Sequence, residues 1–196
     1  MDDKATLLRY LRTARTDLLG KIDGLSEYDA RRPLTPTGTN LLGLVKHVAS
    51  VQLGYFTDTF GRPTGITAPW LADDAPDDSD MWVPADESTA SIVAFHEASA
   101  QASDEVIEAL DLDAPGTVPW WPDERSAVTL HQILVHVLAE TARHAGHADI
   151  LREHVDGLAG QRVGDANVPA RSSDQWSAYA ARIEAAARAV AESAPS

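Results

Sequence analysis

The sequence contains no cysteine, and this absence excludes two kinds of structure at once. Without thiols the chain can form neither a disulfide framework nor a metal site with thiolate ligands. No apolar run approaches the roughly 18–20 residues that a helix needs to cross a bilayer. The acidic and polar start, MDDKATLLRY, also lacks the apolar core of a secretory signal. We therefore expect a cytoplasmic protein with no membrane partner.

Positive charge is scarce as well. The chain has 16 Lys and Arg residues against 30 Asp and Glu residues, which gives a formal net charge of −14. The lysines are Lys4, Lys21 and Lys46, and the arginines are scattered. Since a nucleic-acid-binding protein needs clustered Lys and Arg to neutralise phosphates, we expect no nucleic-acid partner. Scarce lysine beside abundant alanine and arginine is typical of a GC-rich genome.

Apolar residues recur with helical periodicity in five segments, and neither β-strand alternation nor an internal repeat is evident. The segments span about residues 4–24, 41–59, 89–110, 129–156 and 174–192. Long irregular segments, 61–87 and 111–128, separate three of them. The sequence therefore predicts an all-α fold, a four-helix bundle with long loops and an extra C-terminal helix. The bundle should occupy residues 1–157, and residues 158–196 should form a linker and a helix that packs on the same domain.

The stretch LAETARHAGHADILREH, residues 138–154, places ionisable groups on or beside the apolar face of a predicted helix. Glu140 and His144 are four residues apart, so they lie about 40° apart around the helix axis, one turn along. An unpaired buried carboxylate is costly, and a pair at this spacing can bind one cation. A pair at this spacing is more commonly a solvated pair or an ordinary helix-surface contact. His136 continues the four-residue spacing, but its direction diverges from that of His144 by about 80°.

A third ligand from another helix would strengthen the metal interpretation, and His47 is the candidate. His47 lies in LLGLVKHVASVQLGYF, one residue from the centre of the apolar face formed by Leu44, Val48, Val51 and Tyr55. Taken alone, His47 is also consistent with a histidine at the edge of the core that bonds to a backbone carbonyl or to water.

The runs TNLLGLVKHVASVQLGYF, VPWW and TLHQILVHVLAETARHAGHADILREHVDG together resemble the DinB-like superfamily over about residues 5–157. The chain looks most similar to a subfamily of unknown function, and more distantly to mycothiol-dependent maleylpyruvate isomerase. The resemblance implies an up-down bundle of four helices that binds a divalent metal, usually zinc or nickel, through three side chains. The implied ligands are His47, Glu140 and His144. His147 stands where many members have glutamine, and it is a candidate for a fourth ligand or for a group that contacts the ligands.

The resemblance also implies a metal-dependent transferase or isomerase that uses a low-molecular-weight thiol on small electrophiles. An open metal position lowers the pKa of a bound thiol, and the thiol must come from outside because the chain has no cysteine. Mycothiol is the candidate thiol on the family resemblance and the base composition. Two alternatives stay open: a metal-dependent hydrolase that uses bound hydroxide, and a non-enzymatic, stress-related bundle with a structural metal.

Aromatic residues in the predicted loops are candidates for the wall of a substrate cavity or for a seal over the end of the bundle. They are Trp70, Trp82, Trp120 and Trp121. Tyr55, one or two turns beyond His47, is a candidate for binding the thiol or substrate. Arg143 could hold a substrate carboxylate, although a solvated arginine is the simpler interpretation. A homodimer is also expected.

Overall fold

The computed structural model describes residues 2–72, 74–162 and 164–193. Residue 73 of the predicted 61–87 loop, residue 163 of the predicted linker, and residues 1 and 194–196 of the two predicted domains lie outside this range. Four long helices form the main unit, and the predicted all-α four-helix bundle is confirmed. Their bounds are α1 (Asp3–Leu19), α3 (Leu41–Thr57), α4 (Thr89–Ala109) and α6 (Leu130–Asp156).

Each long helix begins at a side chain that accepts a hydrogen bond from the first turn. These N-cap residues are Asp2, Asn40, Ser88 and Thr129. Such a side chain satisfies one of the backbone N–H groups that a helix start leaves without a partner. At the other end, α6 stops at Gly157, whose φ of 78° is a left-handed conformation that glycine adopts without strain. Local sequence therefore sets the helix ends.

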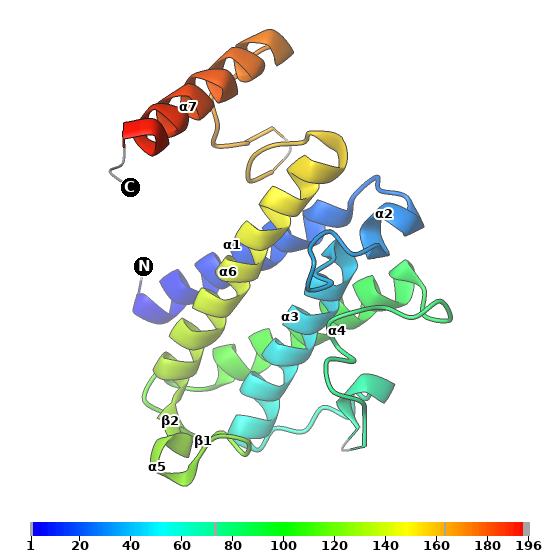
Figure 1. The fold of residues 1–196 in the computed structure, drawn as a ribbon. Coiled ribbons are helices and arrows are strands. Elements are labelled where there is room, and N and C mark those ends of the chain that lie inside the picture. Colours follow the sequence, from blue (N-terminus) through cyan, green and yellow to red (C-terminus); the bar gives the residue numbers. More distant parts are fainter. Residues whose placement is uncertain (1, 73, 163, 194–196) are drawn as a thin grey trace. The chain divides into compact units, whose positions relative to one another are not determined.

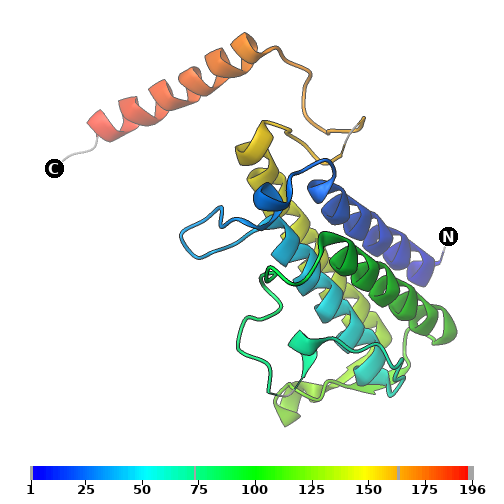
Figure 2. The ribbon, with the colours of Figure 1, turned by 90° about the vertical axis from the view of Figure 1, so that its right-hand side faces the viewer.

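The helices pack so that α1 and α6 run in one direction, while α3 and α4 run in the other (Figures 1 and 2). Helix α3 packs against α4 and α6, and α1 packs against α6 and α4. The chain therefore runs up, down, down and up. In the up-down bundle that the resemblance implies, consecutive helices alternate in direction, whereas here α3 and α4 are parallel. The connection from α3 to α4 must return along the whole bundle, because both helices start at the same end. This requirement explains the long irregular segment between them.

Short elements complete the main unit, and sequence periodicity predicts none of them as a separate element. A β-hairpin pairs Pro115 with Thr129, although no strand alternation is visible in the sequence. Strands of three residues fall below the length at which a period of two can be recognised. The short elements are η1 (Gly20–Ile22), α2 (Glu27–Arg31), η2 (Asp58–Phe60), η3 (Pro69–Leu71), β1 (Pro115–Thr117), α5 (Asp123–Ser126) and β2 (Ala127–Thr129).

Apolar side chains from all four long helices fill the interior. One cluster joins the end of α1 to the start of α3 and the second half of α6, and a second joins the other ends of these helices. Both include fully buried side chains such as Leu18, Phe56 and Ile133. Ion pairs join α1 to α4, for example between Arg15 of α1 and Asp104 of α4. The bundle therefore holds the helix faces in fixed register, as close packing requires.

The segment between α3 and α4 is fastened to the start of α3. Gly43 lies directly beneath the backbone of Met81, where a Cβ atom would overlap the carbonyl group. The side-chain amide of Asn40 donates to the Met81 carbonyl oxygen at 3.1 Å. The buried Lys46 ammonium donates to the Trp82 carbonyl oxygen at 3.0 Å and to Glu87 Oε2 at 2.9 Å. Residues 80–87 are therefore held against α3.

The chain divides into two compact units, residues 1–166 and 167–196. The first extends beyond the predicted boundary at residue 157, because Gln161 and Arg162 bind Asp17 of α1. The second contains α7 (Ser173–Ser193), close to the predicted helix over 174–192. Packing of this helix on the bundle stays a prediction. Among the described residues, no helix is both long enough and apolar enough to span a bilayer.

Candidate metal centre

His47 reaches the candidate site from the second turn of α3, and a carboxylate from the long connection fixes its ring. The Nδ1 atom of His47 lies 2.7 Å from Oδ2 of Asp80. Because an ionised carboxylate only accepts hydrogen bonds, Nδ1 is the donor in this contact, which leaves Nε2 as the ring nitrogen that can bind a cation. A histidine held in this way by a carboxylate is the usual arrangement behind a metal ligand.

Glu140 and His144 reach the same place from the middle of α6. His144 Nε2 lies 2.9 Å from Glu140 Oε1, and His47 Nε2 lies 3.8 Å from the same oxygen. The side chains of His47, His144 and Glu140 are 20%, 12% and 31% exposed, so the group is accessible but largely enclosed. The four-residue spacing of Glu140 and His144 places both of these side chains on the face of α6 that meets α3.

The three side chains offer ligand atoms that all lie within 4.8 Å of one another. The rings of His47 and His144 meet edge to face, with centroids 4.9 Å apart. Two imidazole nitrogens and one carboxylate oxygen are a donor set that suits zinc, nickel and related divalent ions. The donor types, their convergence and the carboxylate behind His47 together fit a divalent metal.

The protonation states also suit a metal. Burial raises the pKa of the Glu140 carboxyl, but the hydrogen bond with His144 and the nearby imidazoles outweigh it, so the pKa lies below its usual value. Burial lowers the pKa of the His144 imidazole, and the hydrogen bond to Glu140 only partly opposes this. The hydrogen bond from His47 lowers the pKa of Asp80. At neutral pH these shifts favour ionised carboxylates and a neutral His144, the forms that bind metal.

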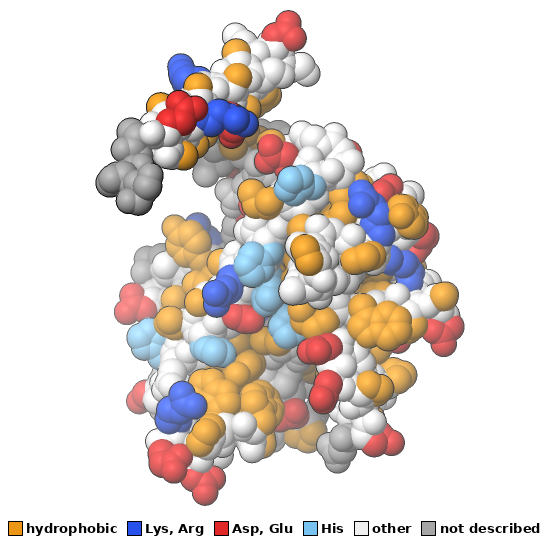
Figure 3. Space-filling view, viewed as in Figure 1, with side chains coloured by type: hydrophobic (Ala, Val, Ile, Leu, Met, Phe, Trp, Pro, Cys, Tyr) orange, Lys and Arg blue, Asp and Glu red, His pale blue; other side chains and the backbone are white. Residues whose placement is uncertain are grey.

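Helices α3 and α6 run in opposite directions. Side chains at four-residue intervals along α3 therefore meet side chains at four-residue intervals along α6 in the reverse order. His47 of α3 contacts His144 of α6, whereas Tyr55, two turns further on, contacts His136 at a centroid distance of 4.8 Å. His136 therefore lies beside Tyr55, two turns from His144, and does not belong to the cluster of described residues. Figure 3 shows a row of histidine side chains with acidic side chains near it on the face that contains α6.

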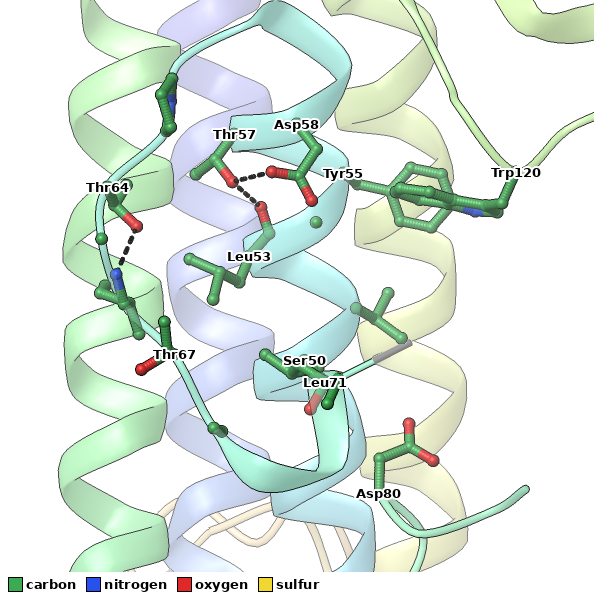
Figure 4. A pocket seen from close by; sticks show the side chains of 17 residues that line it. Ser50, Leu53, Tyr55, Thr57, Asp58, Thr64, Thr67, Leu71, Asp80 and Trp120 are labelled. Atoms are coloured by element: carbon green, nitrogen blue, oxygen red, sulfur yellow. Dashed lines mark hydrogen bonds between the residues drawn. The ribbon is translucent and has the colours of Figure 1, made fainter. Parts of the chain in front are cut away.

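A cleft of about 730 Å³ lies between α3 and residues 63–72 of the long connection. Asp80 lies toward one end, and Tyr55 and Trp120 form an aromatic wall (Figure 4). Since Asp80 also bonds to His47, the cleft adjoins the cluster of His47, Glu140 and His144. Its volume falls within the range typical of small-molecule sites. The cleft and the cluster thus form one candidate site.

The other predicted residues lie around this site. Tyr55 lines the cleft, and its hydroxyl oxygen accepts a hydrogen bond from Trp121 Nε1 at 2.9 Å. His147 and Arg143 are exposed on α6, and the His147 ring lies 5.4 Å from that of His144. Trp70 packs on Phe95 instead of lining the cleft.

Sequence reasoning missed Asp80, which fixes His47, and Asp58, which lines the cleft. Asp80 belongs to the run DDAPDDSD, where five aspartates have similar surroundings in the sequence. Only the path of the long connection selects one of them, so local sequence carried no signal. Asp58 directly follows α3. Its position beyond His47 on the same predicted helix was the one sequence signal that could have suggested a place near the site.

The fold and the cluster define a class: a helical bundle with a candidate divalent-metal centre between two antiparallel helices. The family model described as mycothiol-S-transferase matches residues 6–157, and the chain belongs to this DinB-like family. Among solved structures, a conserved protein from Enterococcus faecalis is 17% identical, with a TM-score of 0.56. The match covers 81% of this chain and 99% of that one, and it supports the fold alone. A search of curated proteins gives no match.

Proposed function

We propose that the protein is a metal-dependent S-transferase that joins a low-molecular-weight thiol to a small electrophile. The observation that carries the proposal is the convergence of His47, Glu140 and His144 beside the cleft. Family membership supports the use of mycothiol as the thiol. Because the chain has no cysteine, the reacting sulfur must belong to a second substrate.

His47, Glu140 and His144 would hold the metal, for which zinc and nickel are the leading candidates. A bound divalent ion lowers the pKa of a thiol that reaches an open position, which makes a nucleophile near neutral pH. Asp80 keeps the His47 ring in place by holding the proton on Nδ1. Glu140 would supply a negative charge that partly balances the ion. In the reaction the thiol would lose its proton to solvent, and its sulfur would form a bond to carbon. In a substitution the leaving group departs with the electrons of the broken bond, and in an addition to a C=C bond the π electrons move to the neighbouring carbon, which takes up a proton from solvent.

Three side chains, rather than four, make up the cluster within the described part of the chain. Structural zinc sites normally have four protein ligands, whereas catalytic sites leave a position for substrate or water. This difference favours a catalytic role over a structural metal. Tyr55 would contribute to the ligand-binding wall. The roles of Arg143 as a carboxylate clamp and of His147 as a neighbour of the ligands stay predictions, as does the homodimer.

Metal content and thiol conjugation test the proposal together. We expect the purified protein to contain close to one divalent ion per chain, and His47→Ala, Glu140→Ala and His144→Ala each to lose most of it. His131→Ala is the matched control, since His131 is exposed in the first turn of the same helix. Conjugation of mycothiol to a model electrophile should fall with the metal content. Full metal occupancy in all three variants would refute the site, and a metal-loaded protein without turnover would refute the reaction.

A further inference from the structure

The described side chains that line the cleft include carboxylates and hydroxyl groups but no basic group. Among the described lining residues, two are aspartates and none is lysine, arginine or histidine. Hydroxyls come from four Ser and Thr residues, and the remaining lining is apolar or aromatic. We propose that this cleft selects uncharged or cationic electrophiles and disfavours anionic ones. The inference rests on the proposed function, because it names the substrate class for the same site.

The two carboxylates stand at different places along the cleft. Asp80 lies on the side of the metal-binding cluster and is bound to His47. Asp58 lies at the end of α3, exposed to solvent, where Thr57 Oγ1 donates to its Oδ1 at 3.3 Å. Figure 4 shows Asp58 beside Thr57, and Tyr55 on the neighbouring wall. A molecule that entered the cleft would therefore meet negative charge at two places.

The aromatic wall favours the same class of ligand. The rings of Tyr55 and Trp120 meet edge to face at a centroid distance of 5.0 Å, and the Trp120 side chain reaches over Gly54 of α3. The negative faces of aromatic rings attract cations and repel anions. A neutral ligand can also pack on these rings through apolar contact. Neither the wall nor the carboxylates places a positive charge next to an anion.

The basic residues nearest in the sequence are directed elsewhere. Lys46 is 1% exposed, binds Glu87 and lies over the ring of Trp70 at 4.0 Å. Arg62 lines a different hollow, between residues 61–66 and α4. Arg143 is exposed on α6 and does not line the cleft. In the part of the cleft between Tyr55, Asp58 and residues 63–72, an anion would thus have no positive side chain among the described lining residues to offset its loss of hydration.

Binding of unreactive probes tests the inference separately from catalysis. N-substituted succinimides bearing an ethyl, a trimethylammonioethyl or a carboxyethyl group differ mainly in charge. Their binding to the metal-loaded full-length chain can be followed by NMR of the tryptophan indole N–H signals. At low salt we expect the cationic probe to bind about tenfold more tightly than the anionic one, with the neutral probe between them. At 0.5 M salt this preference should shrink.

Asp58→Lys should reduce or reverse this preference, and Asp58→Asn should reduce it less. The control is Asp3→Lys, which changes the net charge equally but lies on α1, away from the cleft. Equal binding of cation and anion, an equal effect of the control variant, or no saturable binding of the cationic probe would overturn the inference.

Parallel assays with the corresponding maleimides and a thiol separate the two proposals. Absence of turnover with the probe preference intact would refute the transferase alone. Equal kcat/KM for anionic and cationic maleimides would refute the selectivity alone.

Discussion

Acidification should destabilise the bundle through one buried histidine, His96. It lies on α4, is 3% exposed, and neither ring nitrogen has a hydrogen-bond partner among the described residues. Burial, and then the positive charge of Arg15, lower its pKa from the ordinary 6.5 to about 4. The folded protein therefore keeps His96 neutral at a pH where the unfolded chain protonates it.

The direction and size of the effect follow from this difference. His96 does not reduce stability above pH 6.5, where it is neutral in both states. As the pH falls from 6.5 to about 4, the unfolded chain binds the proton first, so the free energy of unfolding decreases. At about 1.4 kcal/mol per pH unit, the full loss is about 3 kcal/mol. Since domains are stable by only about 5–15 kcal/mol, a loss of this size is easily measured.

Urea unfolding followed by circular dichroism, with chelator present throughout, measures the effect. We would compare the wild type with His96→Phe, which keeps an aromatic ring and removes the titrating group, and with His131→Phe as the exposed control. The variant His96→Phe should lose about 3 kcal/mol less than the wild type between pH 7 and pH 4. A constant difference between the two proteins across this range would refute the reasoning. Carboxylate titrations are common to all three proteins and cancel in the comparison.

Two further predictions concern the long connection. Asp80→Asn should weaken metal binding by about 10- to 100-fold, because the His47 ring loses its ionised partner. Competition with a chelator measures the metal affinity, and an unchanged affinity would contradict the role of Asp80. Gly43→Ala should destabilise the protein by at least about 1–3 kcal/mol in urea unfolding, because a Cβ atom would overlap Met81. The control is Gly146→Ala, because a Cβ atom on Gly146 of α6 would meet open space; this substitution should be neutral or stabilise the protein by up to about 1 kcal/mol. Similar changes in the free energy of unfolding for Gly43→Ala and Gly146→Ala would count against the Met81 contact.

The long helices could be predicted from the sequence because their determinants are local. Asn40 and Thr129 cap helices where the sequence places them, and Gly157 ends α6. The short helix α2 and the β-hairpin were missed, since each has too few residues to show a period. The direction of the helices also lay beyond sequence periodicity, which identifies the buried face of a helix but not its neighbour.

The candidate site was predictable to the extent that its residues lie on helices. Four-residue spacing brought Glu140 and His144 together, and a polar group next to an apolar face singled out His47. Asp80 was not predictable, because its position depends on a loop path that is fixed by distant contacts. Those contacts are the close approach at Gly43 and the hydrogen bonds to Asn40 and Lys46.

The parallel course of α3 and α4 has an evolutionary consequence. The returning segment carries Asp80 and much of the cleft wall, whereas the helices carry the three side chains of the candidate metal centre. Substitutions or length changes in residues 61–79 can therefore alter which molecules enter the cleft, while the helices and the three side chains of the candidate metal centre stay unchanged. Relatives that share the bundle should diverge fastest along this return path, and new substrate preferences should arise there first.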